Sequence, residues 1–179
     1  RQCSLSAGSQ RNSCAGTKIF VVLNKETTMG LDMYLSKQTD LGNLYVEEKN
    51  RNTVTVQGPM ADFIDTKKIA YLSEEMAYWR KANQIHRWFV ENVQQDKDDC
   101  GKYYVAEEDL KRLLDNVDAV LTDPKKAEKL LPPSAGYFFG SLDIDDSYFD
   151  DLRYTQKVLR EVLKNPLKIG QSYYYESSW

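Results

Sequence analysis

The side chains best suited to chemistry gather in one short stretch, residues 78–89. This stretch holds two of the three tryptophans, the only histidine and three cationic side chains. An imidazole can act as a general base near neutral pH, guanidinium groups bind carboxylates and phosphates, and indole rings pack against ligands. Residues 78–89 are therefore the first candidates for a catalytic or binding site.

Trp79, Asn83 and His86 recur at the spacing of a helix. On one helical face they would offer a stacking surface, an amide and a general base. Together with Arg80 they could line a pocket for a ligand that carries a phosphate and a base. The alternative is that His86 is a hydrogen-bonded histidine of the core and that Trp79 simply packs.

Trp88 points away from that row on the expected helix, toward the face that carries Arg80 and Arg87. An exposed tryptophan beside arginine is typical of a hot spot in a protein–protein interface or of a stacking platform. The alternative is that residues 36–52 or the C-terminal tail cover the indole. The sequence leaves both interpretations open.

Cys100 and a group of acidic residues form weaker patterns. Cys100 could be a nucleophile with His86 as its base, but it precedes a glycine in a polar turn, where a small cysteine is common. The aspartates of residues 143–151 suggest a calcium loop, but Tyr148 and Tyr154 stand where an EF-hand needs Gly and Glu.

A zinc site is not expected, because residues 29–179 hold one cysteine and one histidine, too few for the usual four ligands. The chain also lacks the glycine-rich phosphate-binding motifs and the nucleophile-elbow motif. We therefore expect no metal and no cofactor.

Composition narrows the class of protein. A chain of 179 residues with 41% hydrophobic side chains is long enough for one well-packed domain. Its net charge of −3 gives no reason to expect nucleic-acid binding. Its longest apolar run, residues 19–23, is far shorter than the roughly 20 residues that span a bilayer. We expect no contact with a membrane.

The first 28 residues differ from the rest of the chain. Residues 1–16 are rich in Ser, Gly, Asn and Arg, and Lys25-Glu26 can be encoded by a ribosome-binding sequence at a short distance before Met29. We therefore expect Met29 to be the natural start and residues 1–28 to be translated upstream sequence; the alternative is a real strand over residues 18–23. Without residues 1–28, which carry four basic and one acidic side chain, the net charge is −6. The lone remaining Cys100 fits a reducing cytoplasm.

Apolar patterning predicts strands at both ends of the chain and helices between them. The expected strands are residues 30–35, 53–56, 67–72, 103–105, 136–140 and 172–179, with a loop over 36–52. The expected helices are residues 74–93, 107–121, 124–131 and 147–163. This order predicts a single α+β domain over residues 29–179, with a mostly antiparallel sheet packed against three or four helices.

Several motifs are spread over the same residues. They are MGLDMYL from Met29, YWRKAN from Tyr78 followed by IH and WFV, CGKYYV from Cys100, FFGS from Phe138, and YYY followed by SSW at the end. As a set they resemble a family of small proteins found in tailed phages and in bacterial genomes. The resemblance also favours Met29 as the start. It implies a phage or prophage accessory protein in the cytoplasm of the bacterial host, and it implies no particular activity.

Two functions from different classes follow. The first is a non-enzymatic protein that binds a host or phage protein through the face of Arg80 and Trp88. The second is a small-molecule or nucleotide-binding protein or enzyme with its pocket on the helix of residues 78–89. A histidine in a deep cleft beside Arg80, Tyr148 or Asp151 favours the pocket, whereas a histidine under core side chains favours the protein-binding module.

Overall fold

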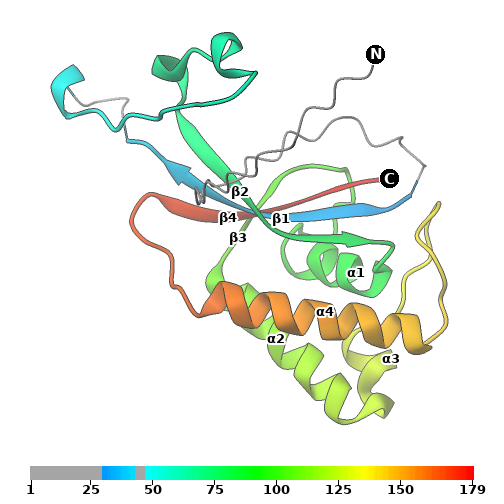
Figure 1. Ribbon diagram of the computed structural model, residues 1–179. Coiled ribbons are helices and arrows are strands. Elements are labelled where there is room, and N and C mark those ends of the chain that lie inside the picture. The colour runs from blue at the N-terminus through cyan, green and yellow to red at the C-terminus, as the bar shows by residue number, and fades with distance from the viewer. Residues whose placement is uncertain (1–29, 43–46) are drawn as a thin grey trace, which may run out of the picture.

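One antiparallel sheet organises the fold, and its central strands come from opposite ends of the described chain. The computed structural model describes residues 30–42 and 47–179 (Figure 1). Within these residues four strands pair in the order β2-β1-β4-β3. They are β1 (Asp32–Asp40), β2 (Tyr71–Arg80), β3 (Tyr103–Val105) and β4 (Gln171–Ser178).

The helices gather on one face of this sheet (Figure 1). The α-helices are α1 (Asn83–Asn92), α2 (Glu107–Thr122), α3 (Ala127–Leu130) and α4 (Asp146–Leu163). Short 3₁₀ turns are η1 (Glu48–Asn50), η2 (Ala61–Phe63), η3 (Thr66–Lys68) and η4 (Pro124–Lys126). The predicted α+β class with an antiparallel sheet is confirmed.

Alternation along the strands separates the two faces of the sheet. Leu31, Met33 and Leu35 are fully buried, while Tyr34 between them points to the opposite face. The inner face of the sheet is therefore apolar and packs against the helices. Burial of this apolar surface away from water is the main contribution that holds the two layers together.

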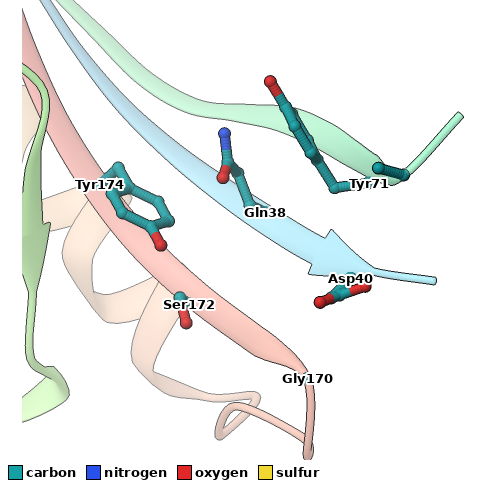
Figure 2. Close-up of a pocket in the computed structure, with 7 residues that line it drawn as sticks. Gln38, Asp40, Tyr71, Gly170, Ser172 and Tyr174 are labelled. Atoms are coloured by element: carbon teal, nitrogen blue, oxygen red, sulfur yellow. The ribbon is translucent and has the colours of Figure 1, made fainter. Parts of the chain in front are cut away.

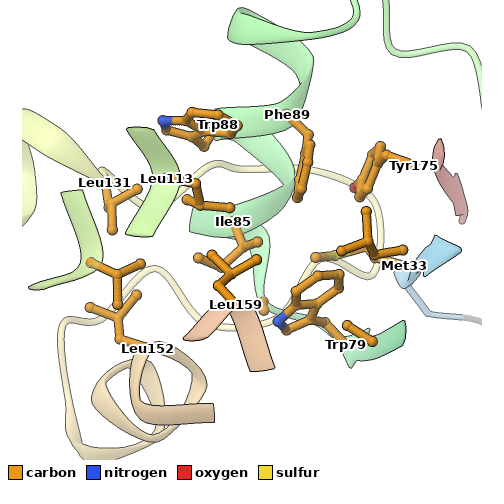
Figure 3. Close-up of a cluster of buried hydrophobic side chains, with 14 of the residues drawn as sticks. Met33, Trp79, Ile85, Trp88, Phe89, Leu113, Leu131, Leu152, Leu159 and Tyr175 are labelled. Carbon is orange, nitrogen blue, oxygen red and sulfur yellow. The ribbon is translucent and has the colours of Figure 1, made fainter. Parts of the chain in front are cut away.

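The core fills the space between the inner face and the helices (Figure 3). Phe89 of α1 stacks on Tyr175 of β4, with ring centroids 3.9 Å apart. Trp79 of β2 donates from its indole nitrogen to the Thr155 hydroxyl of α4 at 2.9 Å. The remaining buried side chains of α2 and α4 are Leu110, Leu113, Val117, Val120, Tyr148, Leu152, Leu159 and Val162.

The predicted helix over residues 74–93 is wrong in its first half, because residues 71–80 form β2. The strand ends at Arg80. The next residue, Lys81, has a left-handed φ of 61°, and α1 begins at Asn83. Trp79 of the strand and Ile85 of the helix face the same core. A strand and a helix that share one core therefore reproduce helical spacing across their junction.

Two other predicted strands are wrong. Residues 53–56 pair with no other strand in the described chain, and residues 136–140 form a turn. In that turn the buried Phe139 ring folds over Gly136, where a Cβ atom would lie 2.3 Å from the ring. The loop predicted for residues 36–52 is wrong at its start, since residues 36–40 continue β1.

The later elements agree with the sequence. The strand over residues 103–105, the helices now labelled α2 and α4, the short helix α3 and the last strand β4 are all confirmed within a few residues. The proposals about Met29 and about residues 1–28 concern a part of the chain that lies outside the described residues. None of the helices in the described residues is long and apolar enough to cross a lipid bilayer.

Candidate functional site

A cavity of about 230 Å³ lies where β2 passes into α1. Its walls come from the end of β2, the start of α1, the turn before α4 and the first turns of α4. Four of the residues predicted as a site line it: Arg80, Asn83, Tyr148 and Asp151. The remaining lining residues are Lys81, Gln84, Gly140, Ser141, Asp143 and Ser147. We call this space the junction cavity.

Asn83 holds the turn that forms one wall of the junction cavity. Its side-chain amide donates to the carbonyl oxygens of Phe139 at 3.1 Å and of Ser141 at 2.8 Å. Its side-chain oxygen accepts from the backbone N–H of Ser134 at 2.9 Å. Asn83 is buried, so these three bonds fix the position of the turn, and the side chain has no donor left to offer a ligand.

Gln84 and Asp151 form a hydrogen-bonded pair in the wall of the junction cavity. Gln84 is only 3% exposed, and its amide nitrogen donates to one carboxylate oxygen of Asp151 at 3.3 Å. Burial raises the pKa of Asp151, with smaller contributions from Asp150 and Asp145, while the bond from Gln84 opposes the shift. The carboxylate thus lacks much of the hydration it would have at the surface.

Arg80 and Lys81 stand at the edge of the junction cavity. Arg80 lies 3.9 Å from the Asp32 carboxylate, which also accepts a hydrogen bond from the Tyr78 hydroxyl. The Lys81 side chain runs beside Gly140, whose φ is +99° and whose absent Cβ would lie 3.1 Å from Lys81 Cβ. A residue other than glycine at position 140 would strain the backbone and crowd Lys81.

His86 lies under core side chains and away from the junction cavity. It is 1% exposed, and its Nδ1 lies 2.7 Å from the Tyr175 hydroxyl. Its Nε2 is 3.1 Å from an Asp98 oxygen, but not in the direction of a hydrogen bond. Burial raises the pKa of Tyr175 well above its ordinary value, with a smaller contribution from Asp98. The imidazole does not line the junction cavity.

The other predicted site residues lie apart from the junction cavity. Trp88 is 4% exposed and packs at the edge of Phe89, with the Arg112 guanidinium 5.8 Å from the indole, so the prediction of an exposed Trp88 is wrong. Trp79 is buried in the core. Arg87 forms an ion pair with Glu91 at 2.6 Å, one helical turn away.

The sheet face opposite the helices is the second candidate surface, which we call the open face. No helix of the described chain covers it (Figure 1). Residues opposite one another in register share a face, so the pairing defines its members. They are Asp32, Tyr34, Ser36, Gln38 and Asp40 of β1, Tyr71, Ser73, Glu75, Tyr78 and Arg80 of β2, Tyr104 of β3, and Ser172, Tyr174, Glu176 and Ser178 of β4.

Tyrosines dominate the open face. Tyr34 and Tyr78 stand opposite each other with ring centroids 5.3 Å apart, and Tyr104 meets Tyr174 at 6.2 Å. Tyr71 contributes to a groove of about 260 Å³ that runs over β1, β2 and β4. Figure 2 shows Gln38 between the two tyrosines of this groove, with Ser172 and Asp40 beside them. Sequence reasoning missed this face, although the consecutive tyrosines at 173–175, whose rings must point to alternate faces of a strand, were a signal for it.

Metal binding finds no support in the part of the chain that the structure describes, which contains no group of three metal-ligating side chains that could hold an ion. Cys100 is exposed at its turn. The hydrogen bond from the Ser147 hydroxyl lowers the pKa of the Asp145 carboxyl group, and the bonds from the backbone N–H groups of Tyr148 and Ser147 add to this shift and cap α4.

The fold and these surfaces define the class of protein. It is an α+β domain with all of its described α-helices on one side of an antiparallel sheet and a tyrosine-rich open face on the other. Comparison of the chain with protein-family models, with curated proteins and with solved structures finds no match.

Proposed function

We propose that the protein is a non-enzymatic protein-binding module, an accessory protein of a phage or prophage that acts on a host or phage protein. The observation that carries this proposal is the row of tyrosines on the open face. A tyrosine ring offers large contact area and a hydroxyl at a small cost in conformational entropy, which is why tyrosine is abundant in binding surfaces.

The small polar residues between the tyrosines support this function. Ser36, Gln38 and Ser172 alternate with or face the rings, and such side chains adapt their hydrogen bonds to a partner backbone. The open face extends over all four strands, and an extended sheet surface fits a protein better than a small molecule.

The charge of the open face indicates the chemistry of the partner. Asp32, Asp40, Glu75 and Glu176 stand on it, against two cations. These are Arg80 and Lys102, whose ammonium lies 4.9 Å from the centre of the Tyr174 ring. Acidic groups in and around aromatic side chains favour a partner surface with lysine and arginine, since complementary charge speeds encounter and excludes like-charged competitors. We therefore expect a partner with a basic patch.

The position of His86 also favours binding over catalysis. His86 was the candidate general base in the sequence, and its ring is buried against those of Phe139 and Tyr175. A base must reach the proton it removes within hydrogen-bond distance, directly or through one water. The buried imidazole meets core rings instead.

Site-specific crosslinking tests the proposal. A photoreactive phenylalanine derivative replaces Tyr104, which is 59% exposed on the open face, and in a matched control it replaces Tyr137, which is 80% exposed in the turn before α4. In infected or lysogenic cells, we expect position 104 to capture one discrete protein and position 137 to capture none.

A double variant then measures the contribution of the face. Tyr71→Ser with Tyr104→Ser removes two exposed rings and should weaken binding of the captured protein at least about tenfold, while Tyr137→Ser leaves it unchanged. Equal capture from positions 104 and 137, or full binding by the double variant, would contradict the proposal.

A further inference from the structure

An exposed apolar turn lies in the segment that joins β1 to β2. Met60, Phe63 and Ile64 are 46%, 79% and 40% exposed, and they hold positions i, i+3 and i+4 around η2. None of the three belongs to the hydrophobic core or packs against it. Large apolar side chains at this spacing are the anchors by which short helical segments enter a groove of another molecule. We call these three residues the apolar turn.

A groove of about 490 Å³ lies between the end of α2 and the first half of α4. Its lining residues are Leu121, Pro124, Phe149, Arg153 and Gln156. Leu121 and Phe149 are only partly buried, although they pack against the core. The groove therefore offers apolar surface together with a cation, and we call it the helix groove.

The apolar turn and the helix groove of one chain lie at opposite ends of the molecule. In Figure 1 the segment between β1 and β2 extends past the end of the sheet at the upper left, whereas the end of α2 and the start of α4 lie near α3 at the lower right. A contact between these two surfaces therefore joins two copies of the chain.

The charges beside the two surfaces are complementary. Asp62 of the apolar turn and Lys125, next to Pro124 of the helix groove, are both exposed and make no ion pair within the described chain. Docking of turn into groove brings this acid and this base together, whereas contact between two turns or between two grooves brings like charges together. Charge thus favours a head-to-tail contact over a symmetric one.

We propose that the apolar turn of one chain docks into the helix groove of a second copy, with Phe63 as the anchor and Asp62 beside Lys125 and Arg153. One copy then keeps a free groove and the other a free turn, so further copies add head to tail. The contact is small, and interfaces below about 1,200 Å² are weak and transient, so association increases with protein concentration. The open face takes no part, so the proposal is independent of the proposed function.

Sedimentation velocity of the full chain over a series of concentrations tests the proposal. We expect the average mass of the wild-type protein to rise with concentration. Phe63→Ser removes the anchor and should weaken association at least about tenfold. Tyr137→Ser is the matched control, because Tyr137 is 80% exposed and Phe63 is 79% exposed, and it should leave association unchanged.

Arg153→Glu changes the helix groove, since it places a negative charge where Asp62 would dock, and it should also weaken association at least about tenfold. Lys164→Glu is its control. Lys164 pairs with Glu161 at 2.6 Å, as Arg153 pairs with Asp150 at 2.6 Å, and both pairs join residues three positions apart on α4 or at its end. Circular dichroism verifies that each variant is folded.

A mixture of two variants distinguishes the head-to-tail contact from any symmetric one. Phe63→Ser keeps an intact groove and Arg153→Glu keeps an intact turn, so the two proteins together should form a dimer that cannot extend, although each alone is a monomer. A wild-type protein that stays monomeric at every concentration would overturn the proposal. So would equal association of Phe63→Ser and Tyr137→Ser, or of Arg153→Glu and Lys164→Glu, or a mixture that remains monomeric.

Discussion

Replacement of Trp88 by alanine tests whether α1 is buried on the side that the sequence assigned to solvent. Trp88 of α1 lies among the buried side chains of the core (Figure 3). Its ring meets that of Phe89 edge-on, and the Arg112 guanidinium of α2 lies 5.8 Å from it. A buried tryptophan removes on the order of 200 Å² from water, which at about 25 cal/mol per Å² gives an upper bound near 5 kcal/mol. Tryptophan-to-alanine changes in cores typically cost about 3–5 kcal/mol.

We therefore expect Trp88→Ala to lower the free energy of unfolding by about 3–5 kcal/mol, a large part of the roughly 5–15 kcal/mol that a domain has. Urea unfolding followed by far-UV circular dichroism measures it, since that signal does not depend on the lost indole. Tyr137→Ala, at an exposed aromatic residue, should change stability by less than about 0.5 kcal/mol. A loss below about 1 kcal/mol for Trp88→Ala, at an unchanged urea dependence, would refute the packing described for α1.

Two further predictions concern the junction cavity. Asn83→Ala leaves the carbonyls of Phe139 and Ser141 and the N–H of Ser134 without their partner, so urea unfolding should show a loss of about 1–3 kcal/mol; a neutral effect would mean that the turn is held by other contacts. Burial raises the pKa of Asp151, so the folded protein binds this proton more tightly than the unfolded chain does, and stability falls as pH rises from the unfolded pKa through the folded one. Asp151→Asn should remove this fall and leave the protein at least as stable as wild type at pH 7. Thermal melts of both proteins between pH 4 and 8 measure this. Parallel dependence of the two melting temperatures on pH would contradict the prediction.

The helices beyond residue 106 could be predicted because each carries a one-sided apolar pattern and a clear end. In α2 the buried side chains recur every three or four positions, as in an amphipathic helix with one face in the core. In α4 the side chain of Asp145 caps the first turn, a signal that the sequence shows directly. Residues close together in the sequence determine where these helices form, so the sequence pattern predicts them.

The junction of β2 and α1 could not be found in this way. A strand with every second residue buried and a helix with every third or fourth residue buried can produce one continuous helical pattern when both face the same core. A glycine or a proline at the turn would have marked the break, but Lys81 takes the left-handed conformation there. The tertiary structure holds this strained residue in place, and no local pattern predicts it.

The candidate cavity was predicted in part for a related reason. Asn83 was expected beside a pocket, and Tyr148 and Asp151 were nominated as neighbours of one, and all three line the same space. Gln84 was not among the residues nominated from the sequence. It is buried because it pairs with Asp151, a residue 67 positions away in the chain. The hydropathy of a side chain does not show whether a distant residue will supply the hydrogen bond that offsets the cost of burying it.

The strand order has a consequence for how the chain acquires its structure. The central strand β1 pairs along its length with β4, so two of the most distant described segments must meet before the sheet is complete. During synthesis β1 leaves the ribosome early and can pair with β2 first, but it cannot pair with β4 until the end of the chain has been made. Long-range pairing of this kind slows folding and leaves the backbone edge of β1 exposed to other chains in the meantime. Yield during expression should therefore depend on temperature and on chaperones that shield strand edges, even when the finished domain is stable.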